Sequence, residues 1–103
     1  MILHLASFRW VDSVTDEDID RLTAALTAMA AQIPELRSYV AGPNLHLRPG
    51  GMDYAVAAVV DDEAGLHAYL DHPAHAQVYA DLMGGMLADR AAAQLPLTEG
   101  SLA

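Results

Sequence analysis

The stretch Tyr69-Leu70-Asp71-His72-Pro73-Ala74-His75 brings a phenol, two imidazoles and a proline together within seven residues. Proline is favoured at the first position of a helix, because its missing N–H would have no partner there. The stretch therefore predicts that one helix ends before Pro73 and that a second begins at it. His72 then occupies the N-cap and His75 the first turn. We expect the rest of the chain to hold this corner against a small sheet.

Composition and charge narrow the classes of protein. The 103 residues are 53% hydrophobic, which is typical of one globular domain. Five basic against 14 acidic residues give a net charge of −9, which disfavours binding to nucleic-acid phosphates. The sequence has no cysteine, no signal peptide and no apolar run of the roughly 20 residues that span a membrane. We therefore expect a cytoplasmic protein without nucleic-acid or membrane partners.

Two apolar strands and one helix are predicted before the corner. Residues 2–10 alternate as a strand, and residues 54–60 form a continuous apolar strand. Between them, Thr15 followed by Asp18 has the spacing of a capping box, and an amphipathic helix follows that must stop before Pro34. A further strand is expected over residues 36–41. We expect Gly42-Pro43 to break or bulge it, with residues 44–48 as a candidate continuation before the turn at residues 49–51.

The end of the chain is ambiguous by composition alone. Its alanines over residues 88–97 suit a helix, whereas the order of elements calls for a final strand, ended or placed on a sheet edge by Pro96. With a strand there, the order predicts an α+β domain over residues 1–97. Its four-stranded antiparallel sheet carries helices on one face. Residues 98–103 are expected to form a loose tail.

Helices on one face leave the other face of this sheet uncovered. The strands at residues 2–10 and 54–60 are nevertheless apolar on both faces. An exposed sheet face of this kind would be a large apolar patch, which usually marks an interface. We therefore expect a homodimer in which two sheets pack face to face.

Several motifs resemble those of one protein family. They are residues 2–5 with 8–10, residues 32–34, Pro49-Gly50 ahead of Tyr54, the signature Tyr69-x-x-His72-Pro73-x-His75-x-x-Val78, and residues 88–90. Together they resemble the stress-responsive A/B barrel domain family over roughly residues 1 to 97. The resemblance implies a ferredoxin-like protomer that forms a dimeric α/β barrel.

The resemblance also implies a site. Many members of the family have no assigned activity. In one branch, the plant polyketide cyclase that makes olivetolic acid, a Tyr–His pair drives an intramolecular aldol cyclisation. By similarity the matching pair here is Tyr69 and His75, with His4 near the pocket. Tyr54 stands where that cyclase has a further histidine.

The residues themselves suggest how such a pair would act. His75 would lie near the positive end of a helix dipole, which disfavours the imidazolium and keeps a neutral base available. It could remove a proton from a carbon next to a carbonyl, while Tyr69 orients it or donates to the developing oxyanion. An apolar pocket between sheet and helices would bind the substrate, lined by His4, Ala6, Phe8, Leu22, Leu26, Met29, Tyr54, Val56 and Ala58.

Other interpretations remain open for the same residues. His72 can be a structural cap, while His4, Tyr69 and His75 can be ordinary core residues. His72 and His75 could reach one metal ion with Asp71 or Asp81, but two histidines alone are a weak zinc signature. We predict no metal and no cofactor.

Three functions follow from these interpretations. The first is a homodimer that binds a small apolar or aromatic molecule and performs cofactor-free cyclase, isomerase or lyase chemistry. The second is a non-catalytic stress-related or scaffold dimer whose histidines are structural. The third, which rests on architecture alone, is an enzyme like the antibiotic-biosynthesis monooxygenases.

Overall fold

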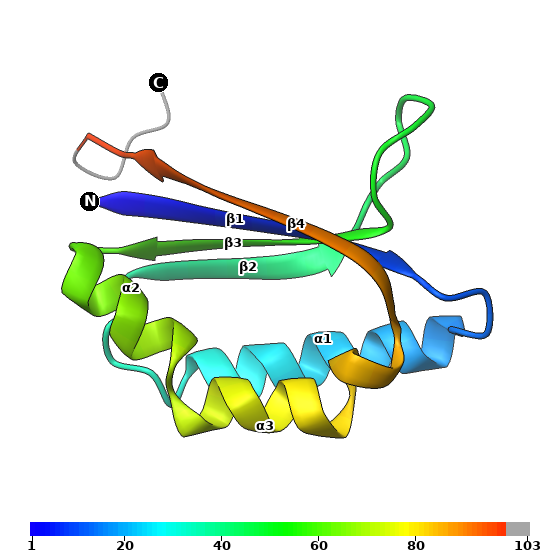
Figure 1. Ribbon diagram of the computed structural model, residues 1–103, viewed down its shortest axis with the longest axis horizontal. Helices are drawn as coiled ribbons and strands as arrows, with labels where there is room; N and C mark the ends of the chain where they lie inside the picture. Colours follow the sequence, from blue (N-terminus) through cyan, green and yellow to red (C-terminus); the bar gives the residue numbers. More distant parts are fainter. Residues whose placement is uncertain (99–103) are drawn as a thin grey trace.

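The computed structural model describes residues 1–98 as a four-stranded antiparallel sheet with its helices on one face (Figure 1). The strand order is β2-β3-β1-β4, and all three strand pairs are antiparallel. The elements are β1 (Ile2–Trp10), α1 (Asp16–Ala30), β2 (Ser38–Pro43), β3 (Tyr54–Val60), α2 (Glu63–Leu70), α3 (Pro73–Asp81), the 3-10 turn η1 (Met83–Gly85) and β4 (Leu87–Pro96). The predicted ferredoxin-like architecture is thus confirmed. Most of the predicted tail, residues 99–103, lies outside the described residues.

Helix α1 begins at the capping box that the sequence predicts. The Thr15 hydroxyl accepts from the backbone N–H of Asp18 at 3.1 Å, and the Asp18 carboxylate accepts from the N–H of Thr15 at 3.0 Å. The helix buries Leu22, Leu26 and Met29 against the sheet. Each such side chain contributes roughly 1.5–3 kcal/mol by leaving water. None of the helices within residues 1–98 is long and apolar enough to cross a membrane.

The prediction for the end of β2 was wrong. Gly42 and Pro43 lie inside the strand, opposite Ala55 and Tyr54 of β3, and residues 44–48 belong to the following loop. Pro43 is tolerated because β2 is an edge strand, where a missing N–H leaves no neighbouring strand unpaired. At the opposite edge, residues 87–96 form a strand, which resolves the ambiguity between helix and strand.

The corner between α2 and α3 forms as its proline predicts. Pro73 is the first residue of α3, and Nδ1 of His72 accepts from the N–H of Ala74 at 3.0 Å. Asp62 caps α2 in the same way, accepting from the N–H of Gly65 at 2.8 Å. Helix α3 ends at Asp81, two residues earlier than expected, and a 3-10 turn covers residues 83–85. The cap fixes where α3 starts and so where the side chain of His75 lies.

The two faces of the sheet differ in what covers them. The even residues of β1 from His4 to Trp10 are buried under the helices. Within residues 1–98 no helix covers the opposite face, which we call the open sheet face (Figure 1). Its exposed apolar side chains include Leu5, Val40 and Leu95. The loop of residues 44–53 projects on the same side and carries Leu45 and Leu47, which are 79% and 82% exposed.

Candidate active site

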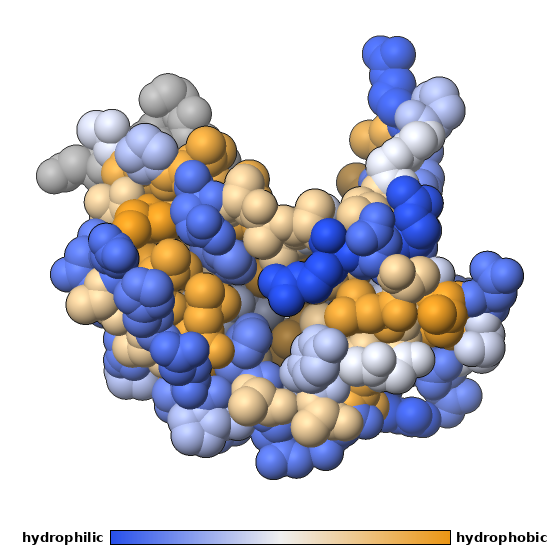
Figure 2. Space-filling model, in the orientation of Figure 1, coloured by the Kyte–Doolittle hydropathy of each residue, from blue (hydrophilic) through white to orange (hydrophobic). Residues whose placement is uncertain are grey.

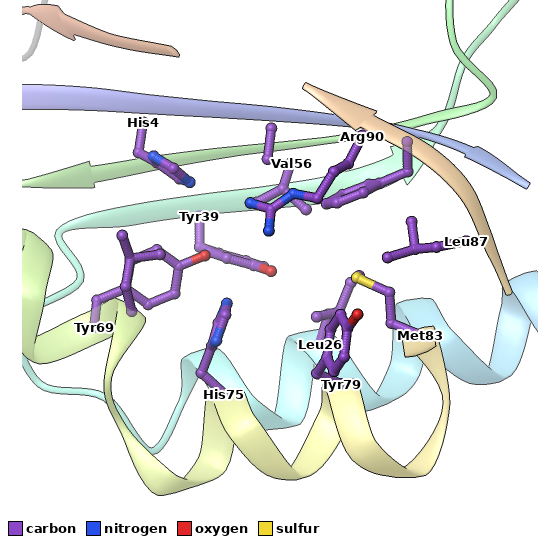
Figure 3. Close-up of a pocket in the computed structure, with 13 residues that line it drawn as sticks. His4, Leu26, Tyr39, Val56, Tyr69, His75, Tyr79, Met83, Leu87 and Arg90 are labelled. Carbon is purple, nitrogen blue, oxygen red and sulfur yellow. The ribbon is translucent and has the colours of Figure 1, made fainter. Parts of the chain in front are cut away.

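A cavity of about 60 Å³ lies between the sheet and the helices (Figure 3). All four strands, the three helices and η1 contribute to its wall. The lining residues are His4, Ala6, Phe8, Leu26, Tyr39, Val56, Tyr69, Leu70, His75, Tyr79, Met83, Leu87 and Arg90. An apolar cavity with a few converging polar groups is the usual form of a small-molecule site. Its volume is less than half of the about 150 Å³ of a cavity known to hold benzene, so the enclosed space suits only a very small ligand.

The ring of Tyr69 lies between two imidazoles. Its centroid is 6.0 Å from that of His4 and 5.3 Å from that of His75, and both contacts are edge to face. Tyr39 adds a third edge contact to Tyr69, with centroids 6.3 Å apart. Four rings from β1, β2, α2 and α3 therefore meet at one end of the cavity.

His4 is a buried, hydrogen-bonded imidazole, only 4% exposed. Nε2 of the Gln94 side chain lies 2.9 Å from His4 Nδ1. An amide nitrogen can only donate, so Nδ1 accepts and the neutral ring carries its proton on Nε2. Burial lowers the pKa of His4 most strongly, and the neighbouring His75 and Arg90 lower it further. His4 is therefore uncharged near neutral pH.

His75 points from the first turn of α3 into the cavity (Figure 3). Within residues 1–98 its ring forms no hydrogen bond. Burial is the main cause that lowers its pKa, the charge of Arg90 lowers it further, and Asp71 raises it slightly. The imidazole is thus neutral near pH 7 and holds an uncommitted ring nitrogen, the state that a general base requires.

The two buried phenols keep their protons. Burial raises the pKa of Tyr39 and of Tyr69 above the usual value. The Tyr69 hydroxyl is close enough to influence Tyr39, but the two do not meet hydrogen-bond geometry. The Tyr39 hydroxyl is therefore buried without a partner among the described residues, and it points into the cavity (Figure 3). Both groups can donate a hydrogen bond to a ligand oxygen.

Arg90 brings a positive charge to the cavity from β4. It lies opposite Phe8 of β1, on the side of the sheet that faces the helices. Its guanidinium is directed toward the middle of the cavity (Figure 3). Arg90 is nevertheless an exposed residue, so it lies at the boundary between cavity and solvent.

The structure brings together only part of the site predicted from the sequence. His4, Ala6, Phe8, Leu26 and Val56 line the cavity with Tyr69 and His75. Four predicted pocket residues do not line it and lie within the packed core: Leu22, Met29, Tyr54 and Ala58. Tyr54 is held elsewhere because its hydroxyl lies 2.8 Å from that of Thr23 on α1.

Six lining residues were absent from the sequence prediction: Tyr39, Leu70, Tyr79, Met83, Leu87 and Arg90. One of them had a detectable signal in the sequence, and one did not. Tyr39 shares its strand face with Ala41, which an alternation argument would have found. Arg90 could have been placed only from the register of β4 against β1, and the sequence left β4 undecided between strand and helix.

His72 takes no part in the cavity wall, because its ring is committed to capping α3. Among residues 1–98 no three His, Cys, Asp or Glu side chains gather closely enough to hold a metal ion.

Comparison with known proteins identifies the family. The model of the Stress responsive A/B Barrel Domain matches residues 2–96. The chain belongs to this family. A curated relative, an uncharacterised protein of Streptomyces coelicolor, is 40% identical over 78 residues, which cover 73% of this chain and 79% of the relative.

Solved structures of other proteins share the fold. A dimeric ferredoxin-like protein of unknown function from Thermobifida fusca is 45% identical with a TM-score of 0.86, covering 93% of this chain and 90% of its own. A hydroxynitrile lyase from Passiflora edulis is 15% identical with a TM-score of 0.79, covering 95% of this chain and 94% of its own. At that identity the lyase shows a common fold alone.

Proposed function

We propose that this A/B barrel protein is a homodimer that binds a small, largely apolar molecule in the cavity and catalyses a cofactor-free proton transfer. His75 acts as the base and Tyr69 as its helper. One observation carries the proposal: an unpartnered, neutral imidazole and two protonated phenols converge in one apolar cavity. A base with a lowered pKa in a cleft is typical of a catalytic site.

The proposed step needs no group beyond these side chains and the substrate. His75 takes a proton from a carbon next to a carbonyl, and the electron pair of the broken C–H bond shifts toward the carbonyl oxygen. Tyr69 donates a hydrogen bond to the enolate oxygen that forms. Return of the proton to another carbon gives isomerisation, and attack of the enolate carbon on a second carbonyl gives cyclisation. The lyase with the same fold supports enzyme chemistry on this architecture.

The homodimer is supported by the open sheet face. Leu5, Val40 and Leu95 expose apolar surface there, and the loop of residues 44–53 adds two further leucines beside it. Figure 2 shows apolar surface along this side of the molecule, next to the projecting loop. The Thermobifida fusca relative, at 45% identity, is described as dimeric. Packing two open faces together would remove this surface from water.

Proton abstraction can be tested without knowing the natural substrate. Butanone dissolved in D₂O exchanges its α-hydrogens for deuterium, and ¹H NMR follows the loss of signal. We expect the protein to accelerate this exchange above buffer and His75→Ala to lower the rate at least about tenfold, since general bases contribute about 10²–10⁴-fold. The matched control is His67→Ala, which removes an exposed histidine of α2. Equal rates for His75→Ala and the unmodified protein would overturn the role of His75.

A second candidate function is ligand binding without catalysis. It is favoured by two histidines whose rings already form hydrogen bonds within the fold: His72 caps α3, and His4 is bonded to Gln94. In this case butanone would shift the NMR signals of the His75 ring, while its α-hydrogens would exchange no faster than in buffer.

A further inference from the structure

We infer that Arg90 is an anion-binding residue of the cavity, and that the ligand carries a carboxylate on its small apolar body. This inference deepens the proposed function, because it names the chemical class of the molecule that would occupy the same cavity. It rests on the position of Arg90, on the absence of a counter-charge in the cavity wall, and on the hydrogen-bond donors around it.

The strand register places the side chain of Arg90 on the cavity side of the sheet. Arg90 lies opposite Phe8, so its side chain leaves β4 on the helix-covered side of the sheet. The neighbouring carboxylate of Asp89 lies opposite Arg9, and successive residues of a strand point to opposite faces. Asp89 accepts from the backbone N–H of Arg90 at 2.9 Å and is not recorded in contact with its guanidinium.

Among residues 1–98, the cavity wall contains no carboxylate to balance this charge, although Asp71 lies near enough to raise the pKa of His75. The other titratable groups of the wall are two imidazoles and three phenols, from His4, His75, Tyr39, Tyr69 and Tyr79. Elsewhere in the described chain, Arg37 pairs with Asp61 at 2.7 Å and Arg21 pairs with Glu17 at 3.7 Å. Within residues 1–98 the side chain of Arg90 forms neither an ion pair nor a hydrogen bond. In a protein of net charge −9, a cation left unpaired at an apolar cavity marks a site for an anion.

The positive charge of Arg90 affects the pKa values of the two neighbouring histidines. Arg90 contributes to lowering the pKa of both His4 and His75, because a nearby positive charge opposes protonation of an imidazole. An anion bound to Arg90 would remove that effect, and both pKa values would rise toward their usual value. Occupation of the site therefore has a spectroscopic signature at His75.

The donor set fits a carboxylate better than a neutral group. A guanidinium presents two parallel N–H groups that match the two oxygens of a carboxylate. The unpartnered Tyr39 hydroxyl points into the same space and can donate to one of them (Figure 3). Leu26, Val56 and Met83 provide apolar surface for the remainder of the ligand. The cavity volume of about 60 Å³ limits that remainder to a short or branched chain.

Isobutyrate and isobutyramide are a matched pair of probes for this inference. They share shape and size, but isobutyrate carries the negative charge. Titration into ¹⁵N-labelled protein, followed by NMR of the His75 ring, gives a Kd for each probe and the pKa of His75 with and without it. We expect isobutyrate to bind at least about tenfold more tightly than isobutyramide and to raise the pKa of His75.

Variants separate the role of Arg90 from a general effect of charge. Arg90→Gln should remove the preference for isobutyrate, and Arg90→Lys should keep part of it, because the charge remains while the planar fork is lost. Arg21→Gln is the control: it removes the same charge from an exposed position on α1 and should leave the preference unchanged. Because Arg90 is exposed, its variants should retain the wild-type amide spectrum.

The outcomes distinguish this inference from the proposed function. Equal binding of both probes at His75, or a preference that survives Arg90→Gln, would overturn the anion site while leaving a ligand-binding cavity. If neither probe shifts the His75 signals, the anion site is also rejected. Acceleration of butanone exchange by the same protein would then still support the proton-transfer function.

Discussion

The side-chain amide of Gln94 lies 2.9 Å from Nδ1 of His4, although 90 positions separate the two residues in the chain. The contact joins β4 to β1 and gives the buried imidazole a fixed tautomer. It also determines which nitrogen of His4 remains for other contacts, because an Nδ1 that accepts leaves Nε2 as the donor.

Replacing Gln94 by Leu should destabilise the protein by about 1–3 kcal/mol, because the buried Nδ1 of His4 would lose its donor. Urea unfolding measures this loss. Gln77→Leu is the matched control, since the amide of Gln77 bonds to Asp81 on the exposed surface of α3. The control should cost less than about 0.5 kcal/mol. Similar losses in the two variants would show that the hydrogen bond to His4 contributes no more to the free energy of unfolding than an exposed one.

His72→Ala should remove the N-cap of α3 and cost about 0.5–2 kcal/mol of unfolding free energy. His72→Asn should recover most of it, because an asparagine side chain can accept the same N–H. The exposed His67 provides the comparison, and His67→Ala should change stability little. Binding of isobutyrate should be retained in His72→Asn. A His72→Ala variant as stable as the wild type would contradict the capping role.

Stability should fall as the pH decreases from about 7.5 to about 5. Both His4 and His75 have a folded-state pKa below their usual value of 6.5. Above that value the histidines are neutral in the folded and in the unfolded chain. Below it the unfolded chain binds protons that the folded chain does not, so the unfolded state is favoured.

Urea unfolding across this range isolates the histidine effect, because most carboxylates bind protons only below about pH 5. His75→Gln should make the decline shallower. His67→Gln is the comparison, since it removes an exposed histidine that does not line the cavity. If the slope is identical in His75→Gln and the wild type, folding does not change the pKa of His75.

Leu5→Asp should convert the proposed dimer to monomers, because it places a charge at the centre of the open sheet face. Sedimentation equilibrium at micromolar concentration measures the mass. Ala28→Asp, on the exposed side of α1, should remain dimeric. If the unmodified protein sediments as a monomer, the open face is not a contact between copies of this chain.

The sequence predicted those parts of the fold that depend on neighbouring residues. Thr15 and Asp18 identify a capping box because its partners are three positions apart, and Pro73 identifies a helix start by its own geometry. The end of β2 was harder to predict, because Pro43 indicates the end of a strand unless that strand lies at a sheet edge. Whether it lies at an edge depends on the order of all four strands.

The residues of the site were likewise predictable where neighbouring positions decide them, and not where distant segments do. Tyr69 and His75 could be paired because one short corner holds both, and His4, Ala6 and Phe8 follow from alternation along β1. The side chain of Tyr54 could not be located from alternation alone, because its hydroxyl is bound to Thr23 of α1, away from the cavity. The position of Arg90 depended on a strand register across more than 80 residues, and local patterns do not contain it.

The cavity and the open sheet face lie on opposite sides of one layer of strands. Along β1, the even positions belong to the first and the odd positions to the second. Substitutions can therefore change ligand preference at one set of positions without disturbing assembly at the other. Such a separation allows a lineage of proteins with this sheet to change the shape and charge of the cavity in evolution while the surface of the opposite face persists.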